Sequence, residues 1–172
     1  MFRTSSRAAD RRSNSNSYYA RQLAATLRTA LAAGDPALAK RLAGGLQARY
    51  PLDEHALCAA QALLVEHTGD HAVAATLYAE AAARWRQFGN VLEHAHALLG
   101  EGRCLLALAD PAAEQPLRQA AELFNSMSYR PALAETEALL EQTTAPRLLD
   151  ALTLLRPSRR VLGRSHRPPK NR

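Results

Sequence analysis

The 172-residue chain contains no isoleucine, only nine aromatic residues, and valine at just four positions, Val65, Val73, Val91 and Val161. β-Strands favour β-branched and aromatic side chains, so this composition argues against a sheet anywhere in the chain. The most frequent residues are instead alanine and leucine, which are strong helix formers. We therefore expect an all-α protein whose alanine-rich helix faces allow close helix packing.

Cysteines and long apolar runs are also scarce. Cys58 and Cys104 are the only cysteines, too few for a disulfide framework, so we expect a reducing compartment and a cytoplasmic protein. No apolar run reaches the roughly 18 residues of a membrane span. The first residues, Met1 to Arg12, are too polar for a secretory signal. Their Arg and Ser content suits a transit peptide or a disordered leader, and we expect the leader.

The net charge of +6 is unevenly distributed. Residues 1–21 carry +4 and residues 156–172 carry +7, whereas residues 22–155 carry −5. The last segment has neither an acidic residue nor an apolar pattern, which is typical of disorder. We expect a disordered basic leader at 1–17, one helical domain at 18–155 and a disordered basic tail at 156–172.

Three Asp-centred turns divide the chain. Asp is a good helix N-cap, Pro suits the first helical position, and Gly ends a preceding helix. Leu and Ala recur at helical spacing on both sides of each turn, so each turn predicts a helical hairpin. Pro116 disfavours a helix interior, so the main helix after the third turn should begin near Glu114, following one loose turn. The turns are Gly34-Asp35-Pro36, Gly69-Asp70-His71 and Ala109-Asp110-Pro111.

A fourth helix pair is expected after these hairpins. Its first helix would run from Pro131 to about Gln142, its turn over Thr143 to Ala145, and its second helix over 146–155. Four leucines would give that last helix an apolar face, which could cap the end of the stack. Alternatively, the same face could dock a partner or a second copy. These leucines are Leu148, Leu149, Leu152 and Leu155.

Small and aromatic residues at fixed positions within the hairpins resemble the tetratricopeptide repeat. The second hairpin carries Ala62, Gly69, Ala74, Tyr78 and Ala81; the third carries Gly102, Ala109, Ala113, Leu117 and Ala120; the first carries Gly34 and Ala39. The Trp-Leu-Gly-Tyr start of the strongest repeats is absent. The resemblance implies a right-handed superhelix of antiparallel helix pairs, a TPR-like α-solenoid with about three hairpins and a capping pair.

Residues 27–140 also resemble the carboxy-terminal repeat region of large bacterial multidomain ATPases. These include adenylate/guanylate cyclase-like proteins and ATP-dependent transcription regulators, and the likeness lies in residues 78–90, 98–108 and 130–136. The chain has no GxxxxGK[ST] phosphate loop and no room for a cyclase domain. The resemblance therefore implies the scaffold part of such a regulator.

The histidines and cysteines are not spaced as metal-binding or catalytic sites require. A predicted turn separates His67 from His71, and His94 and His96 would point to different sides of a helix, so we expect no metal site. No catalytic signature surrounds either cysteine. We therefore expect both cysteines to be small buried packing residues and not nucleophiles. We expect no enzymatic activity and no cofactor.

The inner face of such a superhelix is lined mostly by the first helix of each pair. The repeat register places Arg21, Arg28, Leu63, Glu66, His67, His96 and Arg103 on that face. The three arginines could hold carboxylates of a partner, since guanidinium groups bind carboxylates through paired hydrogen bonds. Alternatively, they are ordinary solvated charges of a helix surface.

The sequence thus favours a non-catalytic helical-repeat module that binds a protein or peptide in its concave groove. This function follows from the usual role of the fold and not from a recognised site. Two alternatives remain open. One is a nucleic-acid-binding protein whose basic tails make weak, salt-sensitive contacts. The other is a truncated remnant of an ATPase- or cyclase-like regulator.

Overall fold

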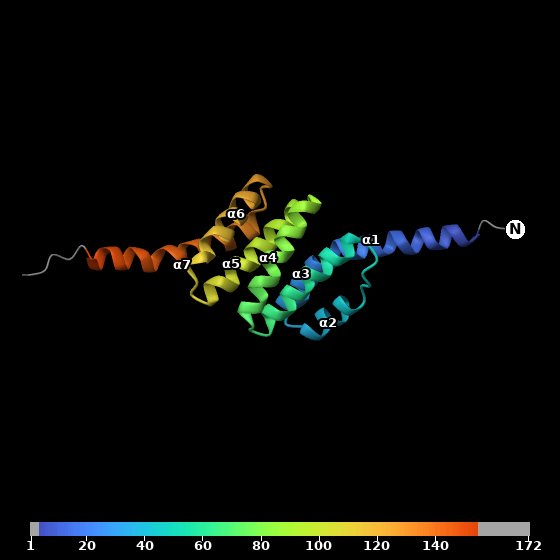
Figure 1. The fold of residues 1–172 in the computed structure, drawn as a ribbon, viewed down its shortest axis with the longest axis horizontal. Helices are drawn as coiled ribbons and strands as arrows, with labels where there is room; N and C mark the ends of the chain where they lie inside the picture. The colour runs from blue at the N-terminus through green and yellow to red at the C-terminus, as the bar shows by residue number, and fades with distance from the viewer. Residues whose placement is uncertain (1–3, 155–172) are drawn as a thin grey trace, which may run out of the picture.

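The computed structural model describes the backbone of residues 4–154 and the side chains of residues 17–143. Over this range the chain is helical, with no strand, and the all-α prediction is confirmed (Figure 1). The elements are α1 (Thr4–Ala32), α2 (Pro36–Gly44), α3 (Pro51–His67), α4 (His71–Phe88), α5 (Val91–Ala107), a short 3-10 turn η1 (Pro111–Ala113), α6 (Glu114–Ser126) and α7 (Arg130–Leu154).

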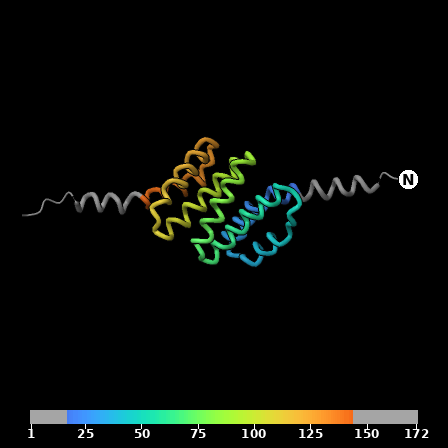
Figure 2. Tube along the Cα trace, viewed as in Figure 1, coloured from blue at the N-terminus to red at the C-terminus, as the bar shows by residue number. Residues whose placement is uncertain are grey.

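Each helix packs against the next one in the chain, and the hairpins follow one another along the long axis of the molecule (Figure 2). The odd-numbered helices also contact one another in succession, α1 with α3, α3 with α5, and α5 with α7. Side chains from the first helix of each hairpin are therefore brought together although they are far apart in sequence.

The three predicted turns are confirmed, and each is capped by its aspartate. Asp35 accepts a hydrogen bond from the Leu38 backbone N–H at 2.8 Å, and Asp70 accepts one from Val73 at 3.2 Å. The residue before each aspartate has a left-handed backbone, with φ of 77° at Gly34, 87° at Gly69 and 54° at Ala109. Glycine adopts this conformation readily, whereas alanine does so only under strain.

The loose turn predicted ahead of Pro116 is also confirmed. The 3-10 turn η1 covers Pro111–Ala113, and α6 begins at Glu114. Pro116 therefore lies in the first turn of α6, where a backbone N–H would have no intrahelical partner. The proline costs no helical hydrogen bond there, and it is buried in the core.

The second helices contribute three large aromatic residues to the core. Trp85, Tyr78 and Phe124 have exposed fractions of 1%, 3% and 0%. Two glycines of α5 lie against this layer. A Cβ on Gly100 would lie 2.5 Å from the Tyr78 ring, and one on Gly102 would overlap the Leu117 side chain. The absence of these Cβ atoms allows α5 to pack closely against α4 and α6.

The predicted turn at Thr143 to Ala145 is wrong. Helix α7 runs unbroken from Arg130 to Leu154, and the Thr143 hydroxyl donates to the Leu140 carbonyl at 2.8 Å. Strong helix formers on both sides of Pro146 outweigh the breaking effect of that single proline. The expected capping pair is therefore one helix. The side chains of 148–155 lie outside the described residues, so their capping role stays a prediction.

The predicted domain limits are not tested by the fold. Helix α1 begins at Thr4, inside the segment 1–17 for which the sequence predicted a disordered leader. No proline or glycine interrupts residues 4–17, and Ala and Arg favour a helix. The predicted tail at 156–172 lies outside the described residues.

Replacing Trp85 with alanine should lower the free energy of unfolding by about 3–5 kcal/mol, because a fully buried indole leaves a large cavity. Val73→Ala on the same helix is the matched control, since Val73 is 48% exposed. We expect that change to cost less than about 0.5 kcal/mol. Urea unfolding followed by circular dichroism measures both. A loss below about 1 kcal/mol for Trp85→Ala would contradict the packing described here.

Candidate functional site

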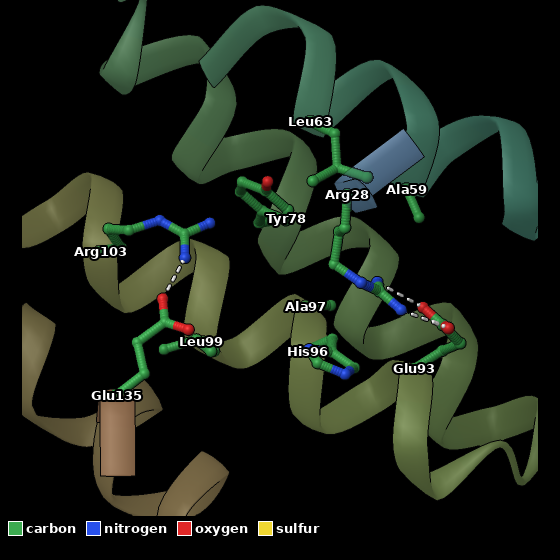
Figure 3. A pocket seen from close by; sticks show the side chains of 10 residues that line it. All are labelled: Arg28, Ala59, Leu63, Tyr78, Glu93, His96, Ala97, Leu99, Arg103 and Glu135. Atoms are coloured by element: carbon green, nitrogen blue, oxygen red, sulfur yellow. Dashed lines mark hydrogen bonds and ion pairs between the residues drawn. The ribbon is translucent and has the colours of Figure 1, made fainter. Parts of the chain in front are cut away.

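A small pocket opens where the first helices of the hairpins meet. Four residues that the sequence placed on the groove face line it: Arg28 from α1, Leu63 from α3, and His96 and Arg103 from α5 (Figure 3). Glu66 does not line the pocket, but it accepts a hydrogen bond from Arg103, which does. The other two predicted residues, Arg21 and His67, are exposed and do not line the pocket. The remaining lining residues are Ala59, Tyr78, Glu93, Ala97, Leu99 and Glu135.

The repeat register explains why these residues converge. Arg28, Leu63 and Arg103 each lie six residues before the left-handed residue of the following turn, at Gly34, Gly69 and Ala109 respectively. Equivalent positions on neighbouring first helices face the same side of the molecule. The three hairpins thus present an arginine, a leucine and an arginine to one space.

One side of the pocket is an ion pair between α1 and α5. The Arg28 guanidinium donates through Nη1 and Nη2 to the two carboxylate oxygens of Glu93, at 2.9 and 2.8 Å. The Glu93 side chain is only 8% exposed, and its backbone N–H donates to Asn90 Oδ1, the N-cap of α5. A carboxylate in the first turn is also stabilised by the helix dipole. The Glu93 side chain is therefore held in place by contacts within the chain.

The opposite side is a larger hydrogen-bonded group centred on Arg103. Its Nε and Nη2 donate to the two oxygens of Glu66 at 2.5 and 2.9 Å, and its Nη1 donates to Glu135 at 2.8 Å. The Tyr78 hydroxyl donates to Glu66 Oε2 at 2.5 Å. The Arg103 guanidinium thereby links α5 to α3 and α7. The hydrogen bond of Tyr78 links α4 to the same group.

These contacts set the protonation of the group. Burial alone would raise the pKa of Glu66, but the hydrogen bond and charge of Arg103, together with the Tyr78 hydroxyl, lower it overall. Burial and the neighbouring Glu66 charge raise the pKa of Tyr78 well above its usual range. At neutral pH Glu66 is therefore a carboxylate and Tyr78 a neutral donor.

His96 is a packing residue of the pocket wall. Its ring meets the edges of Phe124 and Tyr129, with centroids 5.0 and 5.7 Å apart. Burial, and then the charge of Arg28, lower its pKa to about 4, so the ring is neutral at pH 7. One hairpin earlier, His55 meets the edges of two aromatic rings of α4 in the same way. In both hairpins a first-helix histidine thus contacts an aromatic ring of the second helix, and His96 also contacts Tyr129, which lies between α6 and α7.

The pocket is suited to binding one small group. Its volume is about 80 Å³, whereas pockets for metabolites and drugs are commonly about 300–1,000 Å³. It has room for a few waters or for the end of one side chain. Figure 3 shows the Arg28–Glu93 and Arg103–Glu135 ion pairs on opposite sides of the space. Leu63, Ala97 and His96 lie between them.

Other groups that could react or bind metal are not arranged to do so. Burial raises the pKa of the Cys104 thiol to about 12, and it also raises that of Cys58. A protonated thiol is a poor nucleophile. Among the residues that the structure describes, no cluster of three or more His, Cys, Asp and Glu side chains is placed to hold a metal ion. No helix in the same range is long and apolar enough to cross a membrane.

The sequence identified Glu66 but not Glu93 and Glu135, the other two carboxylates that pair with the arginines. Glu93 follows the N-cap Asn90 by three residues, a position at which an acidic residue is expected for capping alone. Glu135 lies on α7, whose first residues carry no repeat register that could be aligned with the earlier hairpins. Tyr78 was identified only as an aromatic position of the repeat, and its hydroxyl also reaches Glu66. The carboxylates that Arg28 and Arg103 hold are thus the chain's own.

No protein-family model, no curated protein and no solved structure matches this chain. Its own structure shows an all-α fold over the described residues, in which each helix packs against its neighbours.

The lowered pKa of His96 predicts a pH-dependent loss of stability. The folded chain keeps the ring neutral to about pH 4, whereas the unfolded chain takes up the proton near 6.5. The free energy of unfolding should therefore fall as pH decreases through this window, by about 2 kcal/mol from this residue between about pH 7 and about pH 4.5. Arg28, Glu93 and Arg103 also face the ring.

Urea titrations of the wild type and His96→Asn at both pH values isolate this contribution, because the other titrating groups are common to the two proteins. The wild type should lose about 2 kcal/mol more than the variant on acidification. An equal loss in the two proteins would show that His96 titrates normally in the folded state.

Proposed function

We propose that this chain is a non-catalytic, TPR-like helical-repeat module that binds a protein or peptide on the face formed by its first helices. In this proposal the hairpins form a right-handed superhelix, and the pocket is part of its concave groove. The observation that carries the proposal is the convergence of Arg28, Leu63, Arg103 and Glu135, from four different helices, on one small space. Such a space fits a side chain of a larger ligand better than a free metabolite.

The polar groups of the pocket suit a peptide. Arg28 uses two of its five N–H groups on Glu93, so others remain for a backbone carbonyl. The carboxylates of Glu93 and Glu135 can accept further hydrogen bonds from backbone N–H groups. Because the ion pairs already hold these side chains in place, little side-chain entropy would be lost on binding.

The resemblance to bacterial multidomain ATPases and cyclase-like proteins suggests a regulatory or scaffold role in the cytoplasm. The nucleic-acid alternative has less support from the described residues. Side chains 17–143 include fourteen acidic and ten basic residues, so an attraction to phosphate would depend on the basic ends alone.

Peptide display on the immobilised full chain tests the proposal. Enriched peptides should shift the NMR resonances of Leu63, Ala97 and Leu99. Ala97→Met should weaken their binding at least about tenfold, because a flexible methionine fills the pocket without changing its charge. The matched control is Ala79→Met at an exposed position of α4, which should leave affinity within about twofold.

The proposal fails if no peptide is enriched. It also fails if the enriched peptides shift residues elsewhere and bind both methionine variants equally.

A further inference from the structure

The charge of the pocket opposes the kind of ligand that its arginines suggest. Arg28 and Arg103 contribute two guanidinium groups, but they are paired with three carboxylates, those of Glu66, Glu93 and Glu135. Tyr78 and His96 add no charge at neutral pH. One negative charge is therefore in excess.

That excess is accessible at Glu135. The Glu93 and Glu66 side chains are only 8% and 15% exposed, whereas Glu135 is 49% exposed. Glu135 accepts from Arg103 through Oε1, and its Oε2 has no protein partner among the described residues. An incoming group can thus bind Glu135 without displacing the partly buried Arg28–Glu93 or Arg103–Glu66 pair.

The space beside Glu135 is apolar. Ala59, Leu63, Ala97 and Leu99 line the pocket between the two ion pairs, and all four are buried. Lysine and arginine combine an apolar stem with a charged end, so the stem can lie on such a surface while the end meets a carboxylate. The volume of about 80 Å³ is sufficient for the end of one side chain.

An acidic side chain would be less well placed. To reach Arg28 through paired hydrogen bonds it would have to displace Glu93, whose side chain is only 8% exposed. Leaving a buried carboxylate without its partner strongly lowers the stability of the folded protein. At Arg103 the same ligand would meet Glu66 and Glu135, which already occupy that guanidinium.

We propose that the pocket receives the cationic end of a lysine or arginine side chain from the bound peptide, with Glu135 as its charge partner. This inference rests on the proposed function and specifies its ligand chemistry. It also reverses the expectation from the sequence, in which the arginines of the groove would hold carboxylates of a partner.

The test uses the full chain, labelled with ¹⁵N, and four short Gly-Ser peptides that differ only in a central Lys, Arg, Glu or Gln. The Lys or Arg peptide should bind at least about fivefold more tightly than the Gln and Glu peptides, measured from shifts of Leu63 and Ala97. Glu135→Gln should remove this preference, and Glu135→Lys should reverse it in favour of the Glu peptide. Glu137→Gln, at an exposed position of the same helix, is the matched control and should keep the preference.

Equal binding of all four peptides, tighter binding of the Glu peptide, or an unchanged preference in Glu135→Gln would overturn the inference. So would the absence of shifts at the pocket. If displayed peptides still bind and Ala97→Met still weakens them, only the charge assignment is wrong. If displayed peptides also fail, the proposed function itself is wrong. NMR spectra of each Glu135 variant establish that it is folded, since Glu135 is half exposed and its replacement leaves the core unchanged.

Discussion

The hydrogen-bonded ion pair between Arg103 and Glu66 is the interaction on which the pocket depends. It is bidentate, and Glu66 also accepts from Tyr78, so side chains of α3, α4 and α5 are joined at one carboxylate. A carboxylate that is only 15% exposed needs this full set of partners to offset its desolvation. The same guanidinium reaches Glu135 on α7, which places the accessible carboxylate at the edge of the pocket.

The backbone that positions this pair comes from the repeated hairpin. Gly100 and Gly102 bring α5 close to α4 and α6, so Tyr78 packs against α5 while its hydroxyl reaches Glu66. Arg28 and Glu93 make a corresponding connection between α1 and α5, which are 65 residues apart at this contact. The apolar surface between the two ion pairs is thus fixed from both sides.

Local chemistry explains which features could be predicted. The Asp-centred turns and the start of α6 at Glu114, after one loose turn, each depend on residues close together in sequence. The repeat register also placed Arg28, Leu63, His96 and Arg103 on one face, because equivalent positions of similar hairpins face the same way. Arg21 and His67 fell outside the pocket because the register gives the direction in which a side chain points but not the limits of the pocket.

The remaining features depend on contacts between distant segments. Nothing near Arg28 in the sequence identifies Glu93 as its partner, and nothing near Arg103 identifies Glu135. The turn at Thr143 to Ala145 was predicted because Pro146 follows it. The helix formers around Pro146 outweigh this single proline, so the helix continues. The partners of the arginines matter most for function, because they change the charge of the pocket from basic to slightly acidic.

A double-mutant cycle on Arg103 and Glu66 tests this account most directly. The free energy of unfolding is measured for the wild type, Arg103→Met, Glu66→Gln and the double variant. The account predicts a coupling of at least about 1.5 kcal/mol, as expected for a hydrogen-bonded charge pair with one partner largely buried. A coupling below about 0.5 kcal/mol, the range of exposed surface pairs, would contradict the claim that this pair holds the pocket together.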